Sequence, residues 1–110
     1  MQKPLQITFR DMEPSEALEA RIRAKAGKLD QIEHRITGCH VVVERLSARH
    51  RSGNDFAVRI DLRVPGREIV VDGVRHEDAY VAVRDAFEAA TRMLHEAAHT
   101  GRDALREVQS

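Results

Sequence analysis

The sequence predicts an α+β fold in which a four-stranded sheet is covered on one face by two helices, in the order β-α-β-β-β-α. Two stretches repeat apolar residues at helical spacing, and four stretches show the alternation or the short apolar runs of strands. The third predicted strand alternates apolar with charged residues, so one face of the sheet is wet and only the other needs a cover. Both helices can supply that cover, which gives a two-layer sandwich.

The first strand and the first helix are predicted from residues 5–32. Leu5, Ile7 and Phe9 alternate with polar residues, as in a half-buried strand. Ser15 is the expected N-cap of the helix, because its hydroxyl can accept from a free amide of the first turn. The apolar stripe of this helix is expected to comprise Leu18, Ile22, Lys25, Leu29 and Ile32, with the methylenes of Lys25 along the core edge.

Three further strands are expected to follow the helix. Residues 39–46 predict a strand that lies parallel to the first, because a helix connects the two. Residues 56–64 give the clearest alternation in the chain. Pro65-Gly66 fits the centre of a type II turn, which leads into a fourth strand over residues 67–72.

The second helix is predicted after Gly73, which we expect to end the fourth strand. Asp78 is its expected N-cap, and its apolar stripe is expected to comprise Tyr80, Val83, Phe87, Ala90 and Leu94. Gly101 is expected to interrupt this helix, so that residues 101–110 form a tail that either frays or continues the helix only briefly. The chain is therefore expected to form a single domain over residues 1–110 with its core within about 4–97.

Composition indicates one globular domain and a cytoplasmic location. The chain has 110 residues, of which 42% are hydrophobic and 33% charged. The sequence contains neither an apolar run of membrane-spanning length nor a signal peptide at its start, so no membrane partner is expected. Cys39 is the only cysteine, so an internal disulfide is impossible, and we expect a small buried side chain in a strand.

Charge is distributed unevenly along a chain whose formal net charge is zero. Residues 20–51 contain eight basic and three acidic residues, a net charge of +5, whereas residues 75–110 contain five basic and seven acidic residues, a net charge of −2. A basic half is suited to a polyanionic partner.

Catalysis, metal binding and cofactor binding are not predicted. The sequence has no glycine-rich phosphate loop, nucleophile elbow or paired His-Glu metal motif. His95 and His99 are four residues apart and could share a metal ion, but no further ligand is obviously placed, so two solvated histidines are expected. Glu77 and Asp78 are explained by capping the second helix.

Aromatic residues are too few to predict a surface that stacks nucleobases. They make up 4% of the chain, and Phe9, Phe56 and Phe87 all fall on expected core positions. The remaining way to bind a nucleic acid is through cations that contact phosphates and follow the shape of a structured RNA. Solvated cations that serve only solubility are the alternative for each of these residues.

The segment 75–84 carries a family resemblance. Its sequence, RHEDAYVAVR, resembles the start of the second helix in the ribosome hibernation promoting factor and ribosome-associated inhibitor family. The first helix is similar too, from the Ser15 start through Lys25 to the Lys28-Leu29 pair with its following acid, and the resemblance extends over about residues 4–97. It implies a fold like that of a double-stranded-RNA-binding domain with an added leading strand.

The resemblance also implies a function and a set of site residues. Family members bind the small ribosomal subunit and its rRNA in the mRNA/tRNA channel and inhibit translation in stressed or stationary cells. They have no catalytic step, cofactor or small-molecule substrate. The rRNA-binding positions that it carries over to this chain are Lys25, Lys28, Arg75 and Arg92. Surface position alone adds Arg21 and Arg84.

The sequence departs from the family pattern in two ways. A chain of this length is expected to be a short-form member without the C-terminal dimerisation domain of long forms. Ala89 and Glu96 occupy positions of the second helix where the family suggests basic residues, so that helix is acidic. The alternative is a protein-interaction or transcription-regulatory module that uses the same fold.

Overall fold

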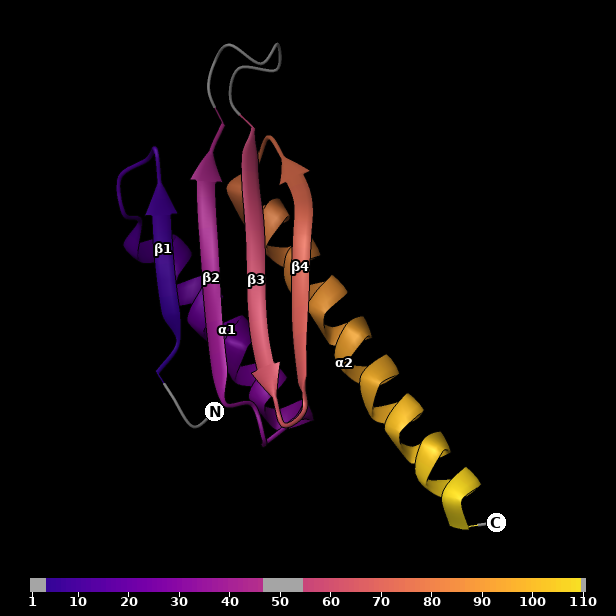
Figure 1. The fold of residues 1–110 in the computed structure, drawn as a ribbon. Coiled ribbons are helices and arrows are strands. Elements are labelled where there is room, and N and C mark those ends of the chain that lie inside the picture. The colour runs from indigo at the N-terminus through magenta and orange to yellow at the C-terminus, as the bar shows by residue number, and fades with distance from the viewer. Residues whose placement is uncertain (1–3, 47–54, 110) are drawn as a thin grey trace.

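The protein is a two-layer α+β sandwich. The computed structural model describes residues 4–46 and 55–109, with side chains described as far as residue 97. Its elements are β1 Gln6–Arg10, α1 Glu16–Ile32, β2 Gly38–Arg45, β3 Phe56–Val64, β4 Arg67–His76 and α2 Ala79–Gln109. Both helices lie against the same face of one four-stranded sheet (Figure 1). This arrangement confirms the predicted fold class and element order.

The strands lie side by side in sequence order, β1-β2-β3-β4. β1 pairs parallel with β2, with Ile7 opposite Val41, whereas β2–β3 and β3–β4 are antiparallel. The parallel pair confirms the prediction, because a helix must carry the chain back to the start of β2. The segment 47–54 between β2 and β3 lies outside the described residues.

The N-terminus of α1 forms as its sequence predicts. Ser15 has extended backbone angles, and its Oγ accepts a hydrogen bond from the N–H of Leu18 at 3.2 Å. Glu16 and Glu19 lie in the first turn, where the helix dipole favours negative charge. These contacts fix where the helix begins and therefore which of its residues face the sheet.

The buried stripe of α1 differs from the prediction at two positions. The structure buries Leu18, Ile22, Ala26 and Leu29. Lys25 is half-buried at the edge of this stripe, as its predicted snorkelling requires, and Ala26 takes the place nearer the core. Ile32 is 42% exposed, so its assignment to the core was wrong, because the helix ends there and the chain turns away toward β2.

β4 is longer than predicted because it contains a β-bulge. Gly73 does not end the strand. It adopts a φ of 81°, and the register shifts so that Val74 pairs with Val58 while Val71 pairs with Ile60. Two residues of β4 therefore oppose one residue of β3, and glycine is the residue that best adopts the positive φ this irregularity uses. At the preceding turn Gly66 has a φ of 77°, which agrees with the predicted type II geometry.

α2 begins at its predicted cap but continues farther than expected. The N–H of Tyr80 donates to Asp78 Oδ1 at 2.9 Å, and the N–H of Ala82 donates to the Asp78 carbonyl at 3.0 Å. The helix then runs through Gly101 without interruption and extends past the end of the sheet (Figure 1). A single internal glycine costs only about 1 kcal/mol relative to alanine, which a 31-residue helix absorbs.

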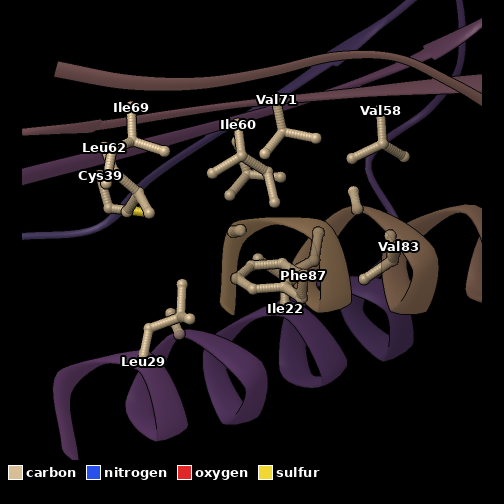
Figure 2. Close-up of a cluster of buried hydrophobic side chains, with 14 of the residues drawn as sticks. Ile22, Leu29, Cys39, Val58, Ile60, Leu62, Ile69, Val71, Val83 and Phe87 are labelled. Carbon is tan, nitrogen blue, oxygen red and sulfur yellow. The ribbon is translucent and has the colours of Figure 1, made fainter. Parts of the chain in front are cut away.

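The core lies between the sheet and the two helices. Figure 2 shows Ile22 of α1 and Phe87 of α2 pointing toward β-strand side chains such as Ile60 and Val71. Cys39 is 4% exposed within this cluster, which confirms its predicted role as a small apolar core residue. Every buried side chain in the described part of the molecule is apolar, so the charged side chains of both helices project from the outer surface.

Candidate nucleic-acid interface

One flank of α1 presents three cations at helical spacing. Arg21, Lys25 and Lys28 are four and three residues apart and lie beside the buried stripe on its α2 side. Arg21 and Lys28 are exposed, and Lys25 is half-buried. Within the described residues none of the three forms an ion pair with a carboxylate. We call these three residues the cationic flank.

Other cations of the α1 region are compensated. On the opposite flank Arg23 Nη2 donates to Glu19 Oε1 at 2.8 Å, one helical turn away. At the C-terminal end of the helix Arg35 donates through Nε to Glu33 Oε1 at 2.9 Å, and its backbone N–H donates to the same oxygen. These hydrogen bonds lower the pKa of Glu33 to about 2. We call Glu19–Arg23 and Glu33–Arg35 the compensated pairs.

The cationic flank meets the start of α2 at an exposed aromatic ring. The Cζ atom of Arg21 lies 5.4 Å from the centroid of the Tyr80 ring, within the range of a cation–π contact. Tyr80 is 39% exposed, so its assignment to the buried stripe of α2 was wrong. Residues four apart lie on the same face of a helix, so Ala79 rather than Tyr80 shares the face of the buried Val83. Tyr80 therefore lies at the edge of the buried stripe, on the side next to α1.

The two predicted cations of α2 are less available than those of α1. Arg84 follows Tyr80 by one turn, and its Nη2 contacts Asp85 Oδ1 at 3.1 Å. Arg92 is exposed and makes no ion pair among the described residues, but Glu88 and Glu96 lie four residues before and after it on the same side of the helix. Arg84 therefore lies on the Tyr80 side of α2 with part of its charge compensated by Asp85, and Arg92 lies between two acidic residues.

Arg75 lies on the other face of the sheet. It pairs with Ala57 across β3 and β4, whereas the neighbouring Val58–Val74 pair points toward the helices. Side chains alternate between faces along a strand, so Arg75 projects from the face without helices. The structure does not bring Arg75 together with Lys25 and Lys28.

The open face of the sheet is polar and carries charges of both signs. Arg59 of β3 contacts both Asp61 at 3.3 Å and Asp72 at 3.2 Å. Thr8 Oγ1 and His40 Nε2 lie 2.8 Å apart across β1 and β2. A depression on this face is lined by residues of both charges, so the face presents no uniform potential to a polyanion.

Groups that could hold a metal ion are not assembled in the described residues. No three of the His, Cys, Asp and Glu side chains in these parts of the chain are placed to share a metal ion. The side chain of His99, which the sequence pairs with His95, lies outside the described residues. Burial, together with the charge of Asp61, raises the pKa of the Cys39 thiol to about 11, so the thiol stays protonated and is a poor nucleophile.

The described helices are not of the kind that crosses a bilayer. Neither of them contains a stretch that is both long and apolar enough to do so.

Comparisons with known proteins identify the fold and the family. A family model described as sigma 54 modulation protein / S30EA ribosomal protein matches residues 5–101. The chain is similar in structure to a ribosomal subunit interface protein from Coxiella burnetii, with a TM-score of 0.74 and 17% identity over 86% of this chain and 97% of that chain. It is also similar to the N-terminal domain of Thermus thermophilus Protein Y, with a TM-score of 0.68 and 19% identity over 81% and 91% of the two chains. No curated protein sequence matches significantly.

The family match covers all four strands, α1, and α2 as far as residue 101. It includes the segment 75–84 on which the resemblance to hibernation factors was based, and it includes the whole cationic flank. The two structural likenesses independently agree with the β-α-β-β-β-α order. The chain therefore belongs to the sigma 54 modulation protein / S30EA ribosomal protein family, the family of ribosome-associated hibernation factors that the start of α2 resembles.

Proposed function

We propose that this protein is a non-enzymatic, cytoplasmic inhibitor of translation that binds the small ribosomal subunit through the cationic flank of α1. The flank contacts rRNA phosphates in the mRNA/tRNA channel, and the bound domain excludes mRNA and tRNA in stressed or stationary cells. The single observation that carries this proposal is the absence of carboxylate partners for Arg21, Lys25 and Lys28 within the described residues. Family membership supports the ribosome as the target.

Phosphate binding follows from the chemistry of the flank. Lysine and arginine donors that have no intramolecular carboxylate can bind phosphate without first breaking an ion pair. Hydrogen bonds to charged groups are worth about 1.5–3 kcal/mol each. Arg21 and Lys28 are separated by about 10 Å along the helix axis, from seven residues at 1.5 Å each, so the flank can contact more than one phosphate. The rigid two-layer core holds these donors in a fixed array.

Co-sedimentation with purified small subunits tests the proposal. We expect the protein to pellet with subunits at low salt and to be released at high salt, because phosphate neutralisation is coupled to counterion release. The double variant Lys25→Glu/Lys28→Glu should bind at least about tenfold more weakly, since it replaces two phosphate-binding charges.

A matched control variant is available in the same region. Arg23→Glu/Arg35→Glu changes the net charge by the same amount but removes only cations of the compensated pairs. We expect it to pellet nearly as wild type, and circular dichroism melts should show that both variants are folded. Equal loss of binding in the two variants, or no pelleting of the wild type at low salt, would contradict the proposal.

A second candidate function rests on the exposed face of α2. Glu88 and Glu96 lie on that face, with Asp85 at its edge, and an acidic helix is suited to a protein partner rather than to RNA. The family description itself includes modulation of sigma 54, a transcription factor. A complex that survives nuclease and high salt, and that is lost in Glu88→Lys/Glu96→Lys, would favour a protein-interaction or transcription-regulatory module.

A further inference from the structure

Tyr80 is an aromatic side chain in an unusual place for this protein. Phe87, in the same helix, is 3% exposed and packs in the core, whereas Tyr80 is 39% exposed. Within the described residues its hydroxyl has no hydrogen-bond partner. Packing therefore accounts for only part of this ring, and the remainder faces water beside the cationic flank.

The ring is held in a defined position by the start of α2. The N–H of Tyr80 donates to Asp78 Oδ1 at 2.9 Å, and the N–H of Asp78 donates to His76 Nδ1 at 2.9 Å. These two contacts order the turn that carries the ring. Since the backbone is already ordered, little conformational entropy is lost when a ligand contacts the ring.

Arg21 lies over the Tyr80 ring without burying it. Its Cζ atom is 5.4 Å from the ring centroid, which is longer than the ~3.5–4 Å of carbon atoms in direct contact. Tyr80 remains 39% exposed, so part of the aromatic surface stays open beside the guanidinium. The guanidinium brings positive charge to this site, where the phosphate of a bound nucleotide could accept from it.

We propose that the Arg21–Tyr80 pair binds an unpaired RNA nucleobase by stacking, next to the phosphates bound by Lys25 and Lys28. The inference rests on the proposed function and adds a base contact to it. Aromatic rings and guanidinium planes are the groups on which proteins stack unpaired RNA bases. Such stacking tolerates any base, so the site selects unstacked nucleotides over duplex without reading a sequence.

The chain provides its own probe for this contact. It contains one tyrosine and no tryptophan, so all tyrosine emission comes from residue 80. The test titrates the protein at low salt with a single-stranded uridine decamer and with an abasic decamer of the same length and charge. We expect the uridine decamer to quench tyrosine emission and to bind about tenfold more tightly than the abasic one.

Variants separate stacking from charge. Tyr80→Leu should remove the preference for the uridine decamer, measured by anisotropy of labelled decamers, while Tyr80→Phe should keep it. Tyr80→Leu should also weaken small-subunit binding by about tenfold at every salt concentration without changing the salt slope. Lys25→Glu/Lys28→Glu should instead lower that slope for both decamers.

The outcomes distinguish this inference from the proposed function. Absence of quenching by the uridine decamer, equal binding of the two decamers, or full subunit binding by a folded Tyr80→Leu would overturn the stacking site. Each of these results leaves phosphate-based ribosome binding intact if the wild type still pellets and Lys25→Glu/Lys28→Glu does not. Failure of the wild type to pellet would overturn the proposed function itself.

Discussion

Both flanks of α1 carry cations, but only one flank also carries a carboxylate that compensates them. Arg23 is bound to Glu19 one turn away, whereas Arg21, Lys25 and Lys28 have no carboxylate partner within the described residues. The difference shows that the number of cations on a helix says little about its capacity to bind a polyanion. The cations that matter are those whose donors are not already occupied.

Both flanks of α1 keep their positions because the buried stripe between them packs against the sheet. A substitution in that stripe should therefore have the largest effect on stability. Ile22 is fully buried between α1 and the sheet, so Ile22→Ala should lower the free energy of unfolding by about 2–5 kcal/mol in urea denaturation. Ile32→Ala is the matched control, because this residue is 42% exposed and its truncation should cost less than about 1 kcal/mol. Similar losses from both variants would mean that α1 is not held by the stripe described above.

Removal of one charge from each flank should have an intermediate effect, on the salt dependence of small-subunit binding. Lys28→Gln removes one unpaired charge and should lower the slope of log affinity against log salt by about 1 for small-subunit binding. Arg23→Gln removes one charge from a compensated pair and should leave that slope nearly unchanged. Equal slopes for the two variants would show that compensation does not decide which cation contacts phosphate.

The smallest expected effect concerns a compensated pair. Arg35 holds the pKa of Glu33 at about 2, below the ordinary value of 4.5, so the folded state binds fewer protons at this group than the unfolded state. The resulting stabilisation is present above about pH 4.5 and is lost as the pH falls toward 2. Glu33→Gln should therefore reduce the fall in Tm between pH 5 and pH 2. The change should be small and should shrink in salt, because the pair lies at the surface. An unchanged pH profile would contradict the assigned pairing.

Local signals in the sequence were sufficient for most of the fold. The cap at Ser15, the turn at Pro65-Gly66 and the alternation over 56–64 depend on neighbours within a few residues, and the structure confirms each of them. The cationic flank is equally local, because its spacing alone puts Arg21, Lys25 and Lys28 on one side of a helix.

Features that depend on distant partners could not be predicted in this way. Strict alternation from Val71 would put Arg75 on the helix-covered face, but the bulge at Gly73 shifts the register by one residue and turns Arg75 to the open face. Helical periodicity within α2 places Tyr80 at the edge of the buried stripe, but how much of an edge residue stays exposed depends on how α1 packs beside α2. Compensation of Arg84 by the adjacent Asp85 depends on side-chain conformation rather than on spacing.

A density map of the protein bound to the small ribosomal subunit would show which surface of the domain contacts the rRNA. We expect the domain to occupy the mRNA/tRNA channel with Arg21, Lys25 and Lys28 facing rRNA phosphates and with the Glu19–Arg23 pair turned away. A map in which the open sheet face contacts the rRNA, or in which the domain lies outside that channel, would contradict the role of the cationic flank.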